Sequence, residues 1–268
     1  MEAVLTSAQN PKVKQLRRLA SSAKARRDEN LYIAEGIHLV QSCIVAGGDV
    51  SLGVYAESAL KNREIMELRE RLDETRITQV VLTDSLFESI ASVHAGVGIL
   101  VVFTPQAPEV TNVLPLSADT VLLDNVQDPS NIGAIMRTVA ATGIRDVLLS
   151  SGCASPWSPK ALRAGMGAQF SLDIYESVNL MEALNTPTIP VCVTALSDDS
   201  VSLYDADLSR PVAWIFGSEG QGVDAELIKA ANVRIKIPQV ESAVESLNVA
   251  SAAAVCLYER YRQAMQNA

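Results

Sequence analysis

The stretch DTVLLDNVQDPSNIGAIMRTVAAT, residues 119–142, joins an apolar strand pattern directly to an amphipathic helix pattern. The Val and Leu run at its start is typical of a strand buried on both faces. After a turn through Asp128-Pro129-Ser130, apolar residues recur on one face of a helix that we expect to span 131–142. These residues are Ile132, Ile135, Met136, Val139 and Ala140. A strand that leads into a helix packed on its own sheet is the repeating unit of an α/β domain.

The same alternation of strands and helices continues on both sides of this stretch. Towards the C-terminus, strand patterns at 145–151, 171–175, 189–196, 211–217 and 233–238 alternate with helix patterns. This arrangement predicts a mostly parallel sheet covered on both faces. Towards the N-terminus, we expect a basic helix over 10–26, an amphipathic helix over 33–47, and further strands and helices up to residue 105.

A proline-containing segment without helical period separates the two series. We interpret residues 106–118 as a linker between an N-terminal domain, 1–105, and a C-terminal domain, 119–268. A length of 268 residues is ample for two domains.

The composition narrows the class of protein. Hydrophobic residues make up 48% of the chain but aromatic residues only 4%, which predicts an aliphatic core. No apolar run reaches the roughly 18–20 residues of a membrane span, and the polar N-terminus lacks a signal-peptide pattern, so we expect a cytoplasmic protein. The four cysteines and two histidines show no metal-ligand spacing, and we expect no metal site.

The acidic net charge of −9 is unevenly distributed. Residues 1–105 carry 12 Lys and Arg against 13 Asp and Glu, whereas residues 106–268 carry 10 against 18. Within the nearly neutral first part, seven cations cluster in one short segment. They are Lys12, Lys14, Arg17, Arg18, Lys24, Arg26 and Arg27. Such a basic stripe can bind nucleic-acid phosphates, although a solvated helix face explains the same charges equally well.

The helix that follows the first strand of the C-terminal domain carries two polar residues of interest. Asn131 begins the expected helix, and Arg137 lies off its apolar face, where it can reach a ligand. Gly133 permits close approach of another backbone or a ligand. Taken alone, however, an arginine on a helix face is most often part of the solvated surface.

A second motif, WIFGSEGQGV at 214–223, places three glycines and Glu219 directly after an apolar strand. Ligands of open α/β sheets bind beyond the carboxyl ends of the strands, and glycines let the backbone approach them. The spacing GxxGxG differs from the dinucleotide-binding GxGxxG, and no helix opens on the glycines, which argues against a nucleotide-dependent dehydrogenase.

A third motif, IKIPQVESAVESLNVASAAAVCLYE at 235–259, runs from a strand through a polar loop into the last helix. Ser246 is the predicted N-cap of that helix, and Leu247 and Asn248 are expected in its first turn. Free N–H groups at that position favour electron-rich ligands.

Together, the motifs resemble those of the SpoU (TrmH-type) RNA 2'-O-ribose methyltransferases of the SPOUT superfamily. Residues 122–144, 214–223 and 237–259 are similar to the family's three motifs in order and separation, and 158–170 resembles a further family segment. Residues 10–40 resemble the substrate-binding domain of longer members, which is similar to ribosomal protein L30e. The resemblance therefore covers nearly the whole chain.

This resemblance implies a C-terminal parallel α/β domain with a deep trefoil knot, preceded by a small L30e-like α/β domain. It implies S-adenosyl-L-methionine as the cofactor and a homodimer formed through the knotted domain, with an active site that draws on both subunits. The implied cofactor-binding residues are Leu196, Gly217, Ile237, Ser246 and Leu247. The implied catalytic residues are Asn131, Arg137, Glu219, Ser246 and Asn248.

Methyl transfer to a ribose 2'-hydroxyl needs aligned reactants and help with the hydroxyl proton. The resemblance makes Arg137 the activating residue, but a guanidinium stays protonated at ordinary pH. We therefore favour a role in which Arg137 holds the adjacent phosphate and stabilises the developing alkoxide. An arginine acting as a base is the alternative. The N-terminal domain is expected to bind the RNA through Lys12, Arg17, Arg18, Arg26 and Arg27.

One departure from the family pattern and several alternatives remain open. Gln239 stands where the family usually has Met, in a loop that borders the cofactor site, and the loop lacks its usual glycine. The two-domain form favours ribosomal RNA over transfer RNA as the substrate. A base-directed methyltransferase of the superfamily and a non-catalytic RNA-binding or ribosome-assembly protein with the same fold are further alternatives.

Overall fold

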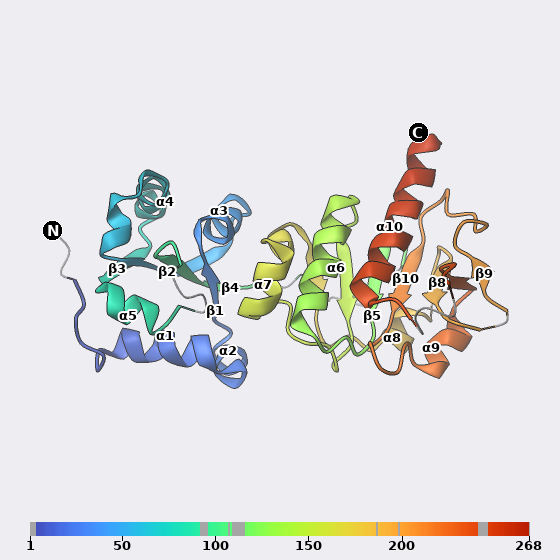
Figure 1. Ribbon diagram of the computed structural model, residues 1–268, viewed down its shortest axis with the longest axis horizontal. Helices are drawn as coiled ribbons and strands as arrows, with labels where there is room; N and C mark the ends of the chain where they lie inside the picture. The colour runs from blue at the N-terminus through green and yellow to red at the C-terminus, as the bar shows by residue number, and fades with distance from the viewer. Residues whose placement is uncertain are drawn as a thin grey trace. The chain divides into compact units, whose positions relative to one another are not determined.

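The computed structural model describes residues 4–91, 96–106, 108, 116–185, 187–197, 199–240 and 246–267. The chain divides into two compact units (Figure 1). The first comprises Met1–Gln106 and Trp157–Phe170, and the second Ala107–Pro156 and Ser171–Ala268. Residues 157–170, which we assigned to the C-terminal domain from sequence, thus lie in the first unit. The predicted linker lies largely outside the described residues, and the domain boundaries stay a prediction.

The first unit contains a four-stranded sheet in the order β1-β4-β2-β3, with helices on both sides (Figure 1). β4 is antiparallel to both of its neighbours, and β2 and β3 are parallel. The strands are β1 (Tyr32–Glu35), β2 (Asp49–Ala56), β3 (Thr78–Leu82) and β4 (Ile99–Thr104). The helices are α1 (Pro11–Ser21), α2 (Ala23–Glu29), α3 (Ile37–Val45), η1 (Ser58–Lys61), α4 (Arg63–Glu74), α5 (Asp84–Glu88) and α7 (Pro159–Gly165), and η2 (Ala168–Ser171) follows α7.

Two of the helices predicted in this unit are longer than the helices observed there. The segment 33–47 is not one helix, because its first residues form β1 and pair with β4, and Gly36 turns the chain at a φ of 96° before α3. The basic segment 10–26 is broken at Ser22, whose hydroxyl accepts a hydrogen bond from the N–H of Ala25 at 3.1 Å and so caps α2. Because the apolar residues of 33–47 occur at mixed spacing, periodicity alone did not reveal β1.

The second unit is built on a seven-stranded sheet in the order β7-β6-β5-β10-β8-β11-β9. All of its pairings are parallel, which confirms the predicted parallel α/β sheet. The strands are β5 (Thr120–Leu123), β6 (Asp146–Leu149), β7 (Asp173–Tyr175), β8 (Val191–Thr194), β9 (Val201–Ser202), β10 (Ala213–Phe216) and β11 (Val233–Lys236). The helices are α6 (Pro129–Ala141), α8 (Leu180–Ala183), α9 (Ala225–Ala230) and α10 (Val249–Gln266). The trefoil knot stays a prediction.

Helices cover this sheet on its faces. α6 and α10 lie side by side (Figure 1). Four residues predicted on the apolar face of α6 are fully buried, namely Ile132, Ile135, Met136 and Val139. A second apolar cluster packs residues of α8 and α9, among them Leu180 and Leu227, against Leu122, Leu148 and Ile215 of the sheet. The strands therefore need apolar residues at successive positions, as their sequences show.

The structure gives three findings on membrane spans, metal sites and cysteines. Within the described residues, no helix is long and apolar enough to cross a membrane, and no cluster of His, Cys, Asp and Glu is arranged to hold a metal ion. The four cysteines are free. Burial raises the pKa of Cys43 and of Cys192 to about 12, so these thiols stay protonated.

A partly buried ion pair fixes α10 to the sheet. Arg260 donates from Nε and Nη2 to the two carboxylate oxygens of Asp119, at 3.0 and 2.8 Å. The Arg260 side chain is 8% exposed and that of Asp119 24%. Asp119 also accepts a hydrogen bond from the N–H of Val212 at 2.9 Å. The pair thereby joins the last helix to the residues that immediately precede β5 and β10.

The Arg260→Met substitution should lower the free energy of unfolding of the second unit by about 3 kcal/mol, because it leaves the Asp119 carboxylate without its partner. Urea unfolding can be followed by the fluorescence of Trp214, the sole remaining tryptophan in a Trp157→Phe background. Lys229→Met, which breaks an exposed pair with Glu226 in the same unit, should cost less than about 1 kcal/mol. Equal losses in the two variants would contradict a structural role for the Arg260 pair.

Candidate active site

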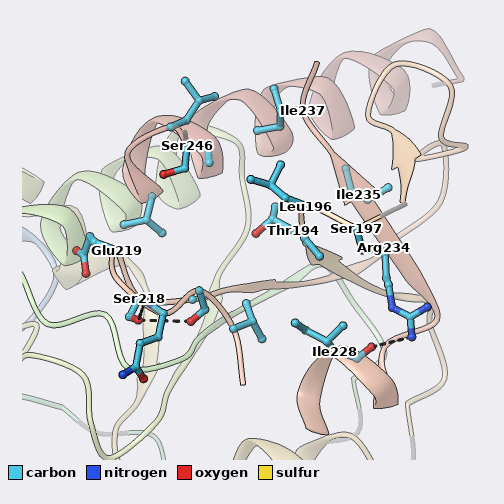
Figure 2. Close-up of a pocket in the computed structure, with 18 of the residues that line it drawn as sticks. Thr194, Leu196, Ser197, Ser218, Glu219, Ile228, Arg234, Ile235, Ile237 and Ser246 are labelled. Atoms are coloured by element: carbon cyan, nitrogen blue, oxygen red, sulfur yellow. Dashed lines mark hydrogen bonds between the residues drawn. The ribbon is translucent and has the colours of Figure 1, made fainter. Parts of the chain in front are cut away.

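The carboxyl ends of three adjacent strands, β8, β10 and β11, border a cavity of about 630 Å³ in the second unit (Figure 2). The loops that follow these strands and the start of α10 form its walls. Its volume lies within the roughly 300–1,000 Å³ of small-molecule sites. The cavity also lies at the edge of the sheet where open parallel sheets bind their ligands.

The glycine loop after β10 forms one wall of the cavity. Ser218 and Gly222 exchange two backbone hydrogen bonds, of 2.9 and 3.0 Å, which close a tight turn around Glu219. A Cβ atom on Gly217 would lie 2.1 Å from the carbonyl carbon of Gly222, so only glycine fits at position 217. Gly222 itself has a φ of +71°. The glycines therefore bring the two ends of the loop close together, and the predicted close approach of this backbone to a ligand stays a prediction.

All five residues predicted to bind the cofactor line this cavity, namely Leu196, Gly217, Ile237, Ser246 and Leu247. Leu196 and Leu247 are large apolar side chains that remain 61% and 39% exposed. Exposed apolar side chains beside a cavity are suited to cover a flat apolar ligand group. Gln239 lines the cavity too, whereas residues 241–245 of the same loop lie outside the described residues.

Three of the predicted catalytic residues form one hydrogen-bonded chain. Asn131, in the first turn of α6, donates from Nδ2 to Glu219 Oε1 at 2.5 Å. Asn248, at the start of α10, donates from its own Nδ2 to Asn131 Oδ1 at 3.1 Å. These hydrogen bonds link two helices and the glycine loop, and Glu219 is also part of the cavity wall. The structure therefore brings together residues that are 88 and 117 positions apart in sequence.

The start of α10 differs from the prediction. Ser246 is not the N-cap, and neither Leu247 nor Asn248 lies within the helix. Asn248 is the cap: its Oδ1 accepts hydrogen bonds from the N–H groups of Ala250 and Ser251, at 3.0 and 3.2 Å. Asparagine caps a helix as well as serine does, so sequence preference did not distinguish the two positions. Ser246 is released from capping and lies in the cavity wall (Figure 2).

Arg137 is separate from this group. α6 begins at Pro129, capped by Asp128, two residues earlier than predicted. Arg137 therefore lies in its third turn, whereas a helix that begins at Asn131 would place it in the second. It is six residues beyond Asn131, about 9 Å further along the helix and on a different face. Arg137 is exposed and forms no hydrogen bond or ion pair with the described residues, nor does it line the cavity.

A charged pair in the cavity wall was missed from sequence. Arg234 of β11 donates from Nη1 to Asp199 Oδ2 at 2.5 Å, and its Nη2 donates to the carbonyl of Ile228 at 3.4 Å. A hydrogen bond from Ser197 and the charge of Arg234 lower the pKa of the Asp199 carboxyl. Arg234 stands in the pattern VRIKIP, which reads only as a strand, and nothing in that pattern indicates a ligand.

Five of the seven cations in the predicted basic stripe of the first unit are exposed. Arg26 is buried, and its Nη1 donates to the carbonyls of Leu19 and Ala20 at 2.6 and 3.2 Å. It thereby satisfies carbonyls at the end of α1, and its burial lowers the pKa of the guanidinium. Arg17 is half-buried and donates to Ser89. The exposed cations of the stripe are Lys12, Lys14, Arg18, Lys24 and Arg27.

Comparisons with known proteins agree with this description. The sequence model of the SpoU rRNA Methylase family matches residues 119–258, and that of an MRM3-like substrate binding domain matches residues 10–100. The chain is 32% identical to an uncharacterized tRNA/rRNA methyltransferase, slr1673, of Synechocystis sp., over 97% of this chain and 94% of that protein. It is also 32% identical to the 23S rRNA (guanosine(2553)-2'-O)-methyltransferase RlmP of Bacillus subtilis, over 95% and 97%.

The structure is similar to a crystal structure of an AdoMet-bound rRNA methyltransferase from Sinorhizobium meliloti. The TM-score is 0.86 and the identity 26%, over 97% of both chains. These matches confirm the resemblance inferred from the sequence motifs.

The Asn248→Ala substitution should lower the free energy of unfolding by about 1–2 kcal/mol, because it removes the N-cap of α10. Asn248→Asp is the matched control: it retains the capping oxygens and should cost only a few tenths of a kcal/mol, although it loses the donor to Asn131. Both are measured by urea unfolding in the Trp157→Phe background. A cost for Asn248→Asp as large as that for Asn248→Ala would show that the bond to Asn131, not the cap, stabilises this region.

Proposed function

We propose, from the premise that this chain belongs to the SpoU rRNA methylase family, that it methylates a ribose 2'-hydroxyl of ribosomal RNA with S-adenosylmethionine. The relative from Bacillus subtilis is named for 2'-O-methylation of a guanosine in 23S rRNA. The observation that carries the proposal is the chain of hydrogen bonds from Glu219 through Asn131 to Asn248, which reaches the edge of the cavity. A non-catalytic RNA-binding protein would need no such arrangement.

The cavity suits S-adenosylmethionine in size, polarity and charge. The apolar side chains of Leu196, Ile237 and Leu247 can cover an adenine ring. Its charged lining residues, Asp199, Glu219 and Arg234, sum to one negative charge among the described residues, opposite in sign to the net charge of the cofactor. Bound S-adenosylmethionine supplies an electrophilic methyl group on its sulfonium.

The protein's residues position the substrate and stabilise charge. Asn131 and Asn248 hold the Glu219 carboxylate in one orientation beside the cavity. The guanidinium of Arg137 holds a substrate phosphate and stabilises the alkoxide that develops on the 2'-oxygen. Ser246, free of the cap, is available to the cofactor or the ribose.

We further propose that Arg137 acts on the cavity of a second copy of the chain. This follows from its position away from the cavity of its own subunit. α10 offers a surface for such a homodimer, because Tyr258, Tyr261 and Met265 recur along one side of the helix and are 51%, 40% and 63% exposed. Exposed aromatic residues and methionine are typical of interface cores.

The first unit is proposed to capture the RNA. Its match to a substrate binding domain and the exposed cations of α1 and α2 support this role. Lys12, Arg18 and Arg27 remain candidates for phosphate contacts, whereas the burial of Arg26 makes it a structural residue. Phosphate contacts by such cations give affinity without sequence information.

Arg137→Ala should reduce methyl transfer at least about 100-fold, since removal of one group that stabilises the developing charge costs a factor of that order. Transfer of labelled methyl from S-adenosylmethionine to ribosomal RNA is measured with RNA from cells that lack this protein, and the product is mapped for 2'-O-methylation. Binding of S-adenosylhomocysteine should be unchanged. Arg145→Ala, which removes another exposed arginine of the second unit, is the control and should retain activity.

Mixed dimers test the shared site. Arg137→Ala and Gly217→Val subunits, each inactive alone, should regain part of the activity when mixed, because one of the two sites then has both an intact cavity and an intact arginine. A mixture that stays inactive would place Arg137 in its own subunit's site. Transfer to transfer RNA alone would change the substrate class, and cofactor binding without any transfer would favour the non-catalytic alternative.

Reversal of the exposed stripe in Lys12→Glu, Arg18→Glu and Arg27→Glu together should weaken RNA binding at least about tenfold. It should also reduce the slope of log affinity against log salt by roughly 2, as expected for the loss of three phosphate contacts. Cofactor affinity should not change. The matched control reverses three exposed cations elsewhere in the first unit, Lys61, Arg63 and Arg71. Equal losses in both triple variants would reduce the stripe to a general charge effect.

A further inference from the structure

The ion pair between Arg234 and Asp199 lies in the cavity wall but has no part in the proposed chemistry. In Figure 2, the Arg234 side chain lies on the side of the cavity away from Glu219 and Ser246. The Arg234 side chain is 30% exposed and the Asp199 side chain 61%. An exposed pair contributes little to stability, so its retention in the wall of a cavity calls for another explanation.

The two partners are held in place by separate contacts. Arg234 is anchored by the carbonyl of Ile228 as well as by Asp199, and these contacts use two of the five N–H donors of a guanidinium. On the other side, the hydroxyl of Ser197 donates to Asp199 Oδ1 at 2.7 Å. Ser197 is itself hydrogen-bonded to Ser200, at 2.8 Å between the two hydroxyl oxygens. The wall therefore presents an oriented cation and an oriented anion next to each other.

The charges of the cavity assign this pair to one part of the cofactor. Among the described lining residues, Arg234 is the sole cation, and Asp199 and Glu219 are the anions. S-adenosylmethionine carries a single anionic group, the carboxylate of its amino-acid end, with an ammonium on the neighbouring carbon. Carboxylate recognition is the role for which a guanidinium is best suited, because it can form two parallel hydrogen bonds. A carboxylate placed near Asp199 and Glu219 without Arg234 would meet only repulsion.

We propose that Arg234 and Asp199 bind the amino-acid end of S-adenosylmethionine, the guanidinium holding its carboxylate and the aspartate its ammonium. This inference rests on the proposed function. The ligand zwitterion replaces one ion pair by two, so no charge is left unpaired on binding. The apolar side chains of Leu196 and Ile237 remain available for the adenine, and the sulfonium then faces the side of the cavity that holds Glu219.

Calorimetric titration with two thioether ligands tests this assignment. S-adenosylhomocysteine carries the amino-acid end, whereas 5'-methylthioadenosine has the same adenosine and sulfur without it. Arg234→Met keeps an unbranched side chain but removes the charge, and should weaken S-adenosylhomocysteine about 10- to 100-fold, the usual worth of a hydrogen-bonded charge. Its affinity for 5'-methylthioadenosine should change less than about twofold. Asp199→Asn should show the same selectivity, and Lys229→Met, outside the cavity, should affect neither ligand.

The possible outcomes separate this inference from the proposed function. An equal loss for both ligands would assign the pair to the adenosine part, and no loss for either would leave it outside the ligand site; each result overturns the inference. Failure of the unsubstituted protein to bind either ligand would instead overturn the proposed function. Because Asp199→Asn removes the opposite charge from a more exposed position, it provides a second reading if Arg234→Met perturbs the sheet.

Discussion

The side-chain amide of Asn131 is the contact on which the candidate active site depends. Its Nδ2 joins α6 to the glycine loop and its Oδ1 joins α6 to α10. The orientation of the amide is fixed by the contact with α10. Because Asn248 uses Oδ1 to cap α10, it has only its NH2 group to offer Asn131. Asn131 must then present its oxygen to Asn248 and its NH2 group to Glu219, which has to be the acceptor. The capping of α10 by Asn248 thereby decides which group donates and which accepts in the hydrogen bonds that lead to Glu219 at the cavity.

The parallel sheet makes this network possible. All of its strands end at one edge, and the order β5-β10-β8-β11 places the segments that follow β5 and β10 next to each other. The loop can turn this tightly because Gly217 leaves no room for a side chain and Gly222 adopts a φ of +71°. Arg260 and Asp119 hold α10 against the same sheet. The side chains of Asn131, Glu219 and Asn248 are thus held in place by the strands and helices to whose ends they are attached.

Much of this could be predicted from sequence, because it depends on local patterns. Apolar runs predicted the parallel strands, helical spacing predicted the buried face of α6, and the ordered motifs led to the residues that line the cavity. The failures share a different cause. Ser246 and Asn248 are both good caps, and only the position of Asn131 across the fold favours the second. In sequence, Arg26 cannot be distinguished from its exposed neighbours, because its burial depends on the carbonyls at the end of α1. Arg234 lines the cavity only because residues of other strands and loops complete the wall around it.

The distribution of charge argues for a division of labour between the two units. The second unit, 107–156 and 171–268, carries 18 acidic against 8 basic residues, so it repels RNA at long range. That repulsion is compatible with the cavity proposed for the cofactor, whose described lining is itself slightly negative and suits a positively charged ligand. The proposed attraction for phosphate then comes from the exposed cations of α1 and α2, at the other end of the sequence. Within the acidic unit, Arg137 is exposed and forms no ion pair with the described residues. It therefore suits the proposed contact with one phosphate at short range, where a single guanidinium outweighs the background field.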